Sequence, residues 1–171
     1  MRKIEDEIQT RKFHNGRHKA TINILFTSNW ITDILEKRAA IQKITLQQFN
    51  ILRILRGQYP APATNGLLKQ RMLDKTPDVS RIVDRLVAKG LVSKKPSTVD
   101  RRAVDVLITP RGLDTLAELE GHMLMMDVLQ KNISEAECET LNNLLDKLRG
   151  YIPERVMEPT SMGVRGEHKI Q

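Results

Sequence analysis

The chain has 171 residues, of which 40% are hydrophobic and 29% are charged, a composition typical of a globular domain with a buried core. No run approaches the roughly 18 apolar residues of a membrane span, and no apolar run follows the charged N-terminus as it would in a signal peptide. The single cysteine, Cys138, cannot form an internal disulfide, and we expect a cytoplasmic protein. Because Cys138 falls in the predicted C-terminal helix, we interpret it as a partly buried thiol rather than a redox sensor.

Residues 1–44 are predicted to form an N-terminal arm and one long helix. Residues 1–16 are polar and are expected to be loose or weakly helical. The helix is expected from about Arg17 to Ala40. Its apolar residues form a stripe too broad to be covered from one side only. They are Ile22, Ile24, Leu25, Phe26, Trp30, Ile31, Ile34 and Leu35.

Cap and stop signals predict the next two helices. Thr45-x-x-Gln48 has the pattern of a capping box, so a helix should begin there and end near Gly57. The stretch YPAPAT, residues 59–64, reads as a rigid connector. Its last residue, Thr64, could cap a short third helix.

The stretch DKTPDVSRIVDRLVAKGL, residues 74–91, carries both a start and a stop signal for a fourth helix. Thr76 fits the N-cap, Pro77 the first helical position and Gly90 the position after the C-cap. Apolar residues at helical spacing predict an inward stripe. Three cations recur at intervals of four and should share an outward face. The stripe is Val79, Ile82, Val83 and Leu86, and the cations are Arg81, Arg85 and Lys89.

A hairpin is predicted next. Residues 91–95 and 103–109 read as strands, because apolar and polar residues alternate in the second one. The turn between them contains Arg101 and Arg102.

Two helices and a tail complete the chain. Thr109-Pro110 should start a helix that runs to about Asn132, and Ser134-x-x-Glu137 should start the last one, which ends at Gly150. We predict that residues 111–151 hold these helices and that residues 152–171 form a flexible tail.

The order of these elements predicts a mainly α (α+β) fold, with a winged helix-turn-helix over residues 45–110 between long terminal helices. Residues 69–111 contain eleven basic and five acidic side chains, whereas residues 112–150 contain three basic and eight acidic ones. A basic block of this kind suggests a polyanionic partner, although a solvated surface would have a similar composition.

The region from 79 to 112, VSRIVDRLVAKGLVSKKPSTVDRRAVDVLITPRG, resembles the signature of the MarR family of bacterial transcription regulators. Ile108 stands where that family usually has leucine, a mild departure. The matching residues are Ser80, Asp84, Arg85, Leu86, Lys89, Gly90, Leu91, Val92, Asp100, Arg102, Thr109 and Gly112.

The resemblance implies a homodimer paired through residues 1–44 and 111–151. It also implies a repressor of pseudo-palindromic operators that a small aromatic or lipophilic effector releases from DNA. Arg102 is then the first candidate for the minor groove, while the recognition helix enters the major groove. Asp84 is expected to form an internal salt bridge rather than to read a base. The candidate DNA-binding residues are Ser80, Arg81, Arg85, Arg101, Arg102, Lys69, Lys75, Lys94 and Lys95.

Other functions have weaker support in the sequence. A ligand pocket could involve Phe26, Trp30, Phe49 and Met123, although core packing or a dimer interface explains them equally well. No set of nucleophile, base and acid appears, so we expect neither an enzyme nor a cofactor. His14 and His18 lack further metal ligands nearby, so no metal site is expected. The alternative function is that of a winged-helix adaptor that binds protein without specific DNA readout.

Overall fold

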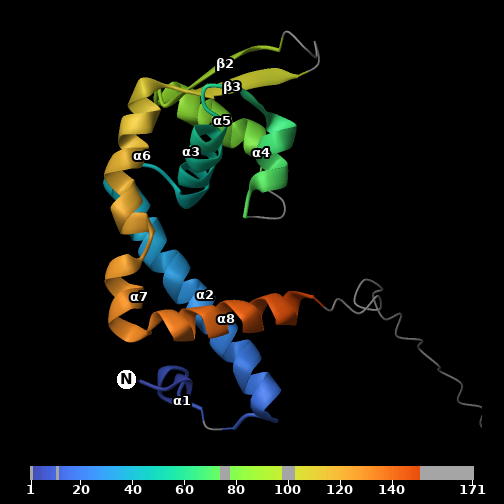
Figure 1. The fold of residues 1–171 in the computed structure, drawn as a ribbon, viewed down its shortest axis with the longest axis vertical. Helices are drawn as coiled ribbons and strands as arrows, with labels where there is room; N and C mark the ends of the chain where they lie inside the picture. Colours follow the sequence, from blue (N-terminus) through green and yellow to red (C-terminus); the bar gives the residue numbers. More distant parts are fainter. Residues whose placement is uncertain (1, 11, 74–77, 98–102, 151–171) are drawn as a thin grey trace, which may run out of the picture. The chain divides into compact units, whose positions relative to one another are not determined.

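The computed structural model describes residues 2–10, 12–73, 78–97 and 103–150 (Figure 1). It confirms a mainly helical fold with a small antiparallel sheet in the strand order β1-β3-β2. The elements in chain order are α1 (Ile4–Glu7), α2 (Gly16–Ile41), α3 (Leu46–Gln58), β1 (Ala63–Thr64), α4 (Asn65–Arg71), α5 (Val79–Ala88), β2 (Val92–Pro96), β3 (Val104–Ile108), α6 (Pro110–Met123), α7 (Met126–Asn132) and α8 (Glu135–Arg149).

The chain divides into two compact units, residues 1–126 and 127–171, and each is described by itself. The first unit holds every element from α1 to α6, and the second holds α8 and nearly all of α7. The predicted tail at 152–171 lies outside the described residues. In the described part of the chain, no helix is both long enough and apolar enough to cross a bilayer.

Four predicted N-caps are confirmed, because a hydroxyl at each of them accepts a backbone N–H of the first turn. Thr45 and Ser134 close full capping boxes with Gln48 and Glu137. Thr64 accepts from the N–H of Leu67, and Thr109 accepts from that of Gly112.

The predicted start of α5 was wrong. The helix begins at Val79, and its N-cap is Asp78, whose carboxylate accepts the N–H of Arg81 at 3.1 Å. Thr76 and Pro77 lie outside the described residues. Aspartate and threonine are both favoured at an N-cap. The start two residues later still places Val79 on the buried face of the first turn.

The predicted single helix from 110 to about 132 was also wrong. The helix α6 ends at Met123, and α7 begins at Met126. Between them Met125 has a φ of 56°, a left-handed conformation that methionine rarely adopts. Its side chain is buried. No glycine or proline marks this break, so local sequence patterns could not predict it.

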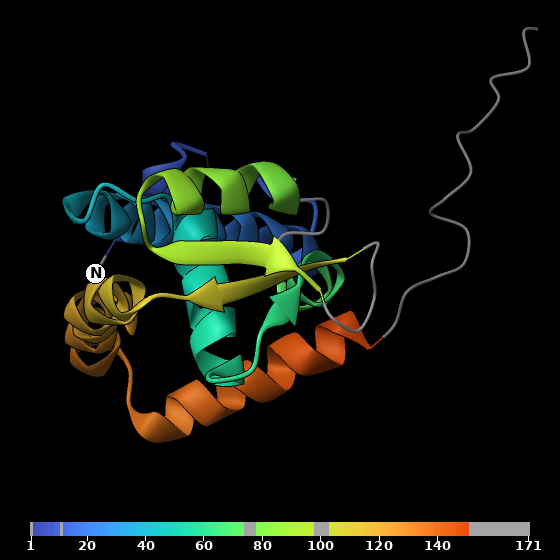
Figure 2. The ribbon, with the colours of Figure 1, turned by 90° about the horizontal axis from the view of Figure 1, so that it is seen from above.

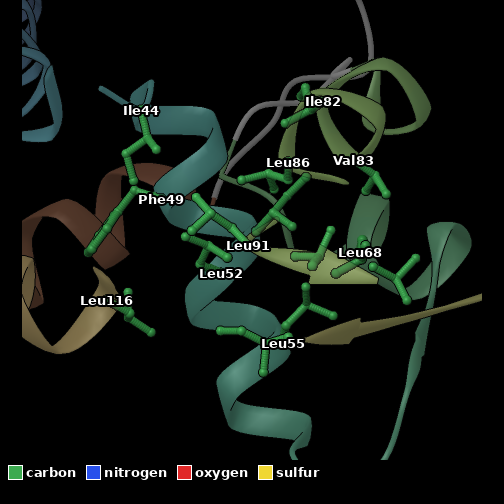
Figure 3. Close-up of a cluster of buried hydrophobic side chains, with 14 of the residues drawn as sticks. Ile44, Phe49, Leu52, Leu55, Leu68, Ile82, Val83, Leu86, Leu91 and Leu116 are labelled. Atoms are coloured by element: carbon green, nitrogen blue, oxygen red, sulfur yellow. The ribbon is translucent and has the colours of Figure 1, made fainter. Parts of the chain in front are cut away.

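The core of the first unit surrounds α3. Ile51, Leu52 and Leu55 on α3 are fully buried, and they pack with residues of the neighbouring helices and strands (Figure 3). Burial of each such side chain contributes about 1.5–3 kcal/mol relative to exposure. The buried side chains of α5 are therefore packed against this core. The partners of α3 in this cluster include Leu68 of α4, Val83 and Leu86 of α5, Val106 of β3, and Leu116 and Leu119 of α6.

By contrast, large apolar side chains of α2 and α8 are exposed. Of the 26 residues of α2, only Ala39 is buried, and α8 has no buried residue. The exposed apolar residues are Ile24, Leu25, Phe26 and Trp30 on α2, and Leu141, Leu144 and Leu148 on α8.

Candidate nucleic-acid interface

The helix α5 has one buried and one charged face. Its four stripe residues, Val79, Ile82, Val83 and Leu86, are buried against the core. Ser80, Arg81 and Arg85 are exposed. Arg81 and Arg85 are four residues apart and so lie one above the other on the helix surface. This arrangement presents two guanidinium groups, which can bind phosphate or guanine edges in two-pronged geometry.

The C-terminal end of α5 is anchored through the start of α6. The hydroxyl of Thr109 donates to the carbonyl of Gly90 at 2.8 Å, and its N–H donates to the carbonyl of Leu91 at 3.1 Å. Gly112 packs so closely that an added Cβ would lie 2.2 Å from the Leu91 carbonyl oxygen. The wing strand β2 leaves from this junction and runs alongside α5 (Figure 2).

An ion pair links α5 to the wing. Lys94 on β2 donates to the carboxylate of Asp84, which confirms the expected internal salt bridge of Asp84. Lys94 was a candidate phosphate contact, and in this structure its ammonium group is paired with Asp84. Lys95, the next residue, is exposed and has no ion-pair partner among the residues that the structure describes.

The predicted outward row of three cations on α5 was partly wrong. Lys89 is only half exposed and turns inward, where its ammonium group donates to the carbonyl of Lys43 and the side chain of Gln48. Lys89 is the C-cap of α5, where the helix ends, so its long side chain follows the domain surface instead of continuing the row.

The helix α4 adds cations that precede α5 in the chain. Lys69 is exposed, as is Arg71 in the last turn of α4. Arg71 was not among the predicted candidates. Its position in the basic block just before α5 is a signal that could have found it. Lys75 lies outside the described residues.

The tip of the wing also lies outside the described residues. The strands β2 and β3 pair from Val92 with Ile108 to Pro96 with Val104. Beyond them, the N–H of Ser97 donates to the carbonyl of Ala103 at 3.1 Å. Arg101 and Arg102 belong to the undescribed residues 98–102, so their assignment to DNA remains a prediction.

A pocket of about 320 Å³ lies beside α3 and α6. Phe49 and Met123, two of the predicted pocket residues, contribute to its wall, whereas Phe26 and Trp30 lie exposed on α2. The full lining is Phe49, Arg53, Arg56, Glu120, Met123 and Leu124.

The pocket wall contains a two-pronged ion pair. Arg56 donates to the two carboxylate oxygens of Glu120 at 2.6 and 2.7 Å. These hydrogen bonds lower the pKa of Glu120 below its ordinary value of 4.5, and they raise the pKa of Arg56. Arg53 adds a second positive charge to the wall.

The rings of His14 and His18 lie close together near the start of α2. The ring centroids of His14 and His18 are 5.2 Å apart, and Nδ1 of His18 accepts the N–H of His14 at 3.3 Å. Within the described ranges, no three His, Cys, Asp or Glu side chains gather as metal ligands.

Comparisons with known proteins agree with this geometry. The model of the MarR family matches residues 44–104. Over 108 residues the chain is 34% identical to the multiple antibiotic resistance protein MarR of Escherichia coli K12, a match that covers 61% of this chain and 73% of that protein.

Two further relatives extend the comparison. Over 100 residues the chain is 34% identical to a protein of Thauera aromatica that is described as a transcriptional regulatory protein for the hcr operon. This match covers 55% of this chain and only 60% of the length of that relative. The fold resembles that of a mutant E. coli MarR in complex with operator DNA. That structure is 28% identical, has a TM-score of 0.64 and covers 86% of this chain and 99% of its own.

Proposed function

The chain belongs to the MarR family, and from this premise we propose that it is a sequence-specific DNA-binding transcription regulator that works as a homodimer. The observation that carries the proposal is the division of α5 between four buried apolar residues and the exposed Arg81 and Arg85. A helix held in this way can enter the major groove, with arginines available for bases or phosphates. The similar fold of a family member in complex with operator DNA supports the same role. The proposal includes no catalytic step.

The exposed apolar residues support the dimer. Leu25 on α2 and Leu144 on α8 are 57% and 60% exposed. An apolar surface of this kind gains free energy when a second copy covers it. In the proposal, residues 1–44 and 111–151 pair the two copies, and residues 45–110 form one DNA-binding lobe in each copy. Two recognition helices related by two-fold symmetry then require a pseudo-palindromic site.

We further propose that the protein is a repressor and that a small ligand releases it from DNA. The pocket beside α3 and α6 supports this, because its size is at the lower end of the range for small-molecule sites. Phe49, Met123 and Leu124 offer apolar surface, and Arg53 and Arg56 offer charge. A ligand held there would contact α6, the helix that leads out of the DNA-binding lobe.

Selection of bound duplexes from a random DNA pool tests the proposal most fully. We expect enrichment of a pseudo-palindrome whose half-sites are about one helical turn, 10–10.5 base pairs, apart. Binding should weaken steeply as salt rises, because phosphate contacts release counterions. A pool without enriched sequences, together with salt-resistant binding to a protein partner, would favour the adaptor function instead.

Within this proposal, Arg102 is the candidate for the minor groove. Replacement of Arg102 by alanine should weaken binding, reduce any preference for A·T-rich flanks and lower the salt slope by roughly one unit. A titration of this variant at several salt concentrations measures all three effects. An unchanged salt slope would exclude Arg102 as a DNA contact.

A further inference from the structure

The contact between the end of α5 and the turn that joins α2 to α3 has a role beyond packing. Lys89, the C-cap of α5, donates from Nζ to the carbonyl oxygen of Lys43 and, at 3.2 Å, to Oε1 of Gln48. These acceptors precede Lys89 by 46 and 41 residues. One ammonium group therefore connects three segments of the chain.

Gln48 makes this contact specific. Gln48 is buried, with only 2% of its surface exposed. Its Oε1 also accepts the N–H of Thr45 at 3.1 Å, as part of the capping box of α3. An amide oxygen has two lone pairs, so Thr45 and Lys89 together satisfy it. Because Gln48 is buried, it can influence DNA binding only through its neighbours.

The Lys43 carbonyl belongs to a turn with an unusual backbone. The N–H of Ile44 donates to the carbonyl of Ala39 at 3.3 Å, and that of Lys43 donates to Ala40 at 2.9 Å. This is the Schellman pattern at the end of α2. Lys43 occupies its left-handed position with a φ of 55°, a position that glycine normally fills. A hydrogen bond from Lys89 supports a turn that local sequence preference does not favour.

The end of α5 has the same pattern, here with glycine. The N–H of Leu91 donates to Leu86 at 3.0 Å, that of Gly90 donates to Val87 at 2.8 Å, and Gly90 has a φ of 70°. Lys89 thus lies at the end of α5, and its ammonium group reaches the turn after α2. A cation is favoured at helix C-termini, because their carbonyls carry partial negative charge. The ammonium group of Lys89 satisfies this preference at the end of α2, where it donates to the Lys43 carbonyl.

We propose that Lys89 is a positioning residue, which fixes the recognition helix to the α2–α3 turn and so places Arg81 and Arg85 for specific DNA readout. This inference rests on the proposed DNA-binding function. Contacts to bases depend on the position of the helix, whereas sequence-independent attraction to phosphates supplies non-specific binding. Loss of the hydrogen bonds from Lys89 to Lys43 and Gln48 should consequently lower the specificity for one DNA sequence more than the general affinity for DNA.

The direct test is Lys89→Met, which keeps the aliphatic stem and removes the donor. The probes are the duplex that the wild-type protein selects from a random pool and a scrambled duplex of equal length. This variant loses both hydrogen bonds of the ammonium group, so we expect the ratio of the two affinities to fall at least about tenfold. Affinity for the scrambled duplex and the salt slope should remain close to those of the wild type.

Gln48 provides a second, independent variant. Gln48→Leu should lower the same ratio, and it should add nothing to Lys89→Met, because Lys89→Met already removes the hydrogen bond between Lys89 and Gln48. The matched control is Thr45→Ala, which removes the other half of the capping box and leaves the Gln48 acceptor for Lys89. It should lower the stability but keep the ratio.

Three results would overturn the inference. A Lys89→Met protein that binds both duplexes equally less well, with a salt slope lower by roughly one unit, would identify Lys89 as a phosphate contact. A Lys89→Met protein with the wild-type ratio of affinities would show that the hydrogen bonds of Lys89 do not position α5. A ratio lowered equally by Thr45→Ala would trace the effect to the cap of α3. Failure of the wild type itself to select any duplex is a different outcome, since it removes the proposed function.

Discussion

The helices α5 and α2 differ in how much of their surface one chain can cover. The ten residues of α5 bury all four of their stripe residues and expose two arginines. The 26 residues of α2 bury only Ala39 and expose Leu25, Phe26 and Trp30. One copy thus completes the packing of α5 but not that of α2. The chemistry of each open surface indicates its partner, which is a polyanion for α5 and another apolar surface for α2.

The difference follows from the sequences of the two helices. The apolar residues of α5 recur in one narrow stripe, so a single supporting layer, centred on α3, covers them. Those of α2 are spread over a broad face, which would need cover from several sides. The predictions below test whether the two helices act as separate parts, one for DNA and one for pairing.

The largest effect should come from a charge in the apolar surface of α2. Leu25→Asp places a carboxylate where the proposed partner copy packs, so dimerisation should be lost and operator affinity should fall more than about 100-fold. Light scattering should then give the monomer mass of 19.6 kDa instead of twice that value. Leu25→Met is the matched control, because it keeps an apolar side chain at the same position and should remain a dimer. A Leu25→Asp dimer would contradict the assignment of α2.

The next effect concerns the support of α5. In Gly112→Ala the added Cβ would lie 2.2 Å from the Leu91 carbonyl oxygen and 2.8 Å from Cγ1 of Ile108, so the start of α6 must shift. We expect a loss of about 2–4 kcal/mol in the free energy of unfolding, measured with urea. Gly121→Ala, on the same helix, meets nothing within 4 Å and should stabilise the protein by up to about 1 kcal/mol. Equal effects of both variants would show that Gly112 is not closely packed.

A smaller effect should distinguish the two charges of the ion pair on α5 and β2. Asp84→Asn removes an anion and leaves Lys94 without its partner, so affinity for DNA should rise a few-fold. Lys94→Met removes the cation and leaves the Asp84 carboxylate unpaired, so affinity should fall by a similar factor. Both side chains are partly exposed, and the free energy of unfolding should change by less than about 1 kcal/mol. Fluorescence titration with the selected duplex checks the signs, and changes of the same sign would contradict this electrostatic explanation.

The smallest effect concerns the pH dependence of stability. The Arg56 guanidinium lowers the pKa of Glu120 below 4.5, so their pair stabilises the folded state above that pH. The contribution is lost as the pH falls through the lowered pKa. It should be small, because both side chains are about 40% exposed. Urea unfolding at a series of pH values should show a weaker acid destabilisation for Glu120→Gln than for the wild type. Identical pH profiles would show that the pair does not contribute.

Short-range patterns predicted most of the fold. The hydroxyls of Thr45 and Ser134 cap helices three residues before Gln48 and Glu137, and such contacts depend only on nearby residues. Such patterns missed the two-residue strand β1, because β1 pairs with Val106 and Asp105 of β3, which lie far along the chain. The break at Met125 was missed for a similar reason, since burial rather than a glycine or proline accompanies it.

The candidate site shows the same limit. The helical period predicted that Arg81 and Arg85 share an exposed face, because that depends only on their spacing. The same period placed Lys89 with them, and this was wrong. Its acceptors come from Lys43 and Gln48, more than 40 residues earlier in the chain. No local pattern contains that contact.

The central claim is that α5 reads DNA through Arg81 and Arg85. Its most direct test is titration of the wild type and of the Arg81→Ala and Arg85→Ala variants against the selected and the scrambled duplex at several salt concentrations. We expect the arginine that contacts a base to contribute about 1–3 kcal/mol of discrimination at one position. The arginine that contacts phosphate should lower the salt slope by roughly one unit. Both variants should remain dimers. If both bind the two duplexes with the affinities and the salt slope of the wild type, α5 is not the recognition helix.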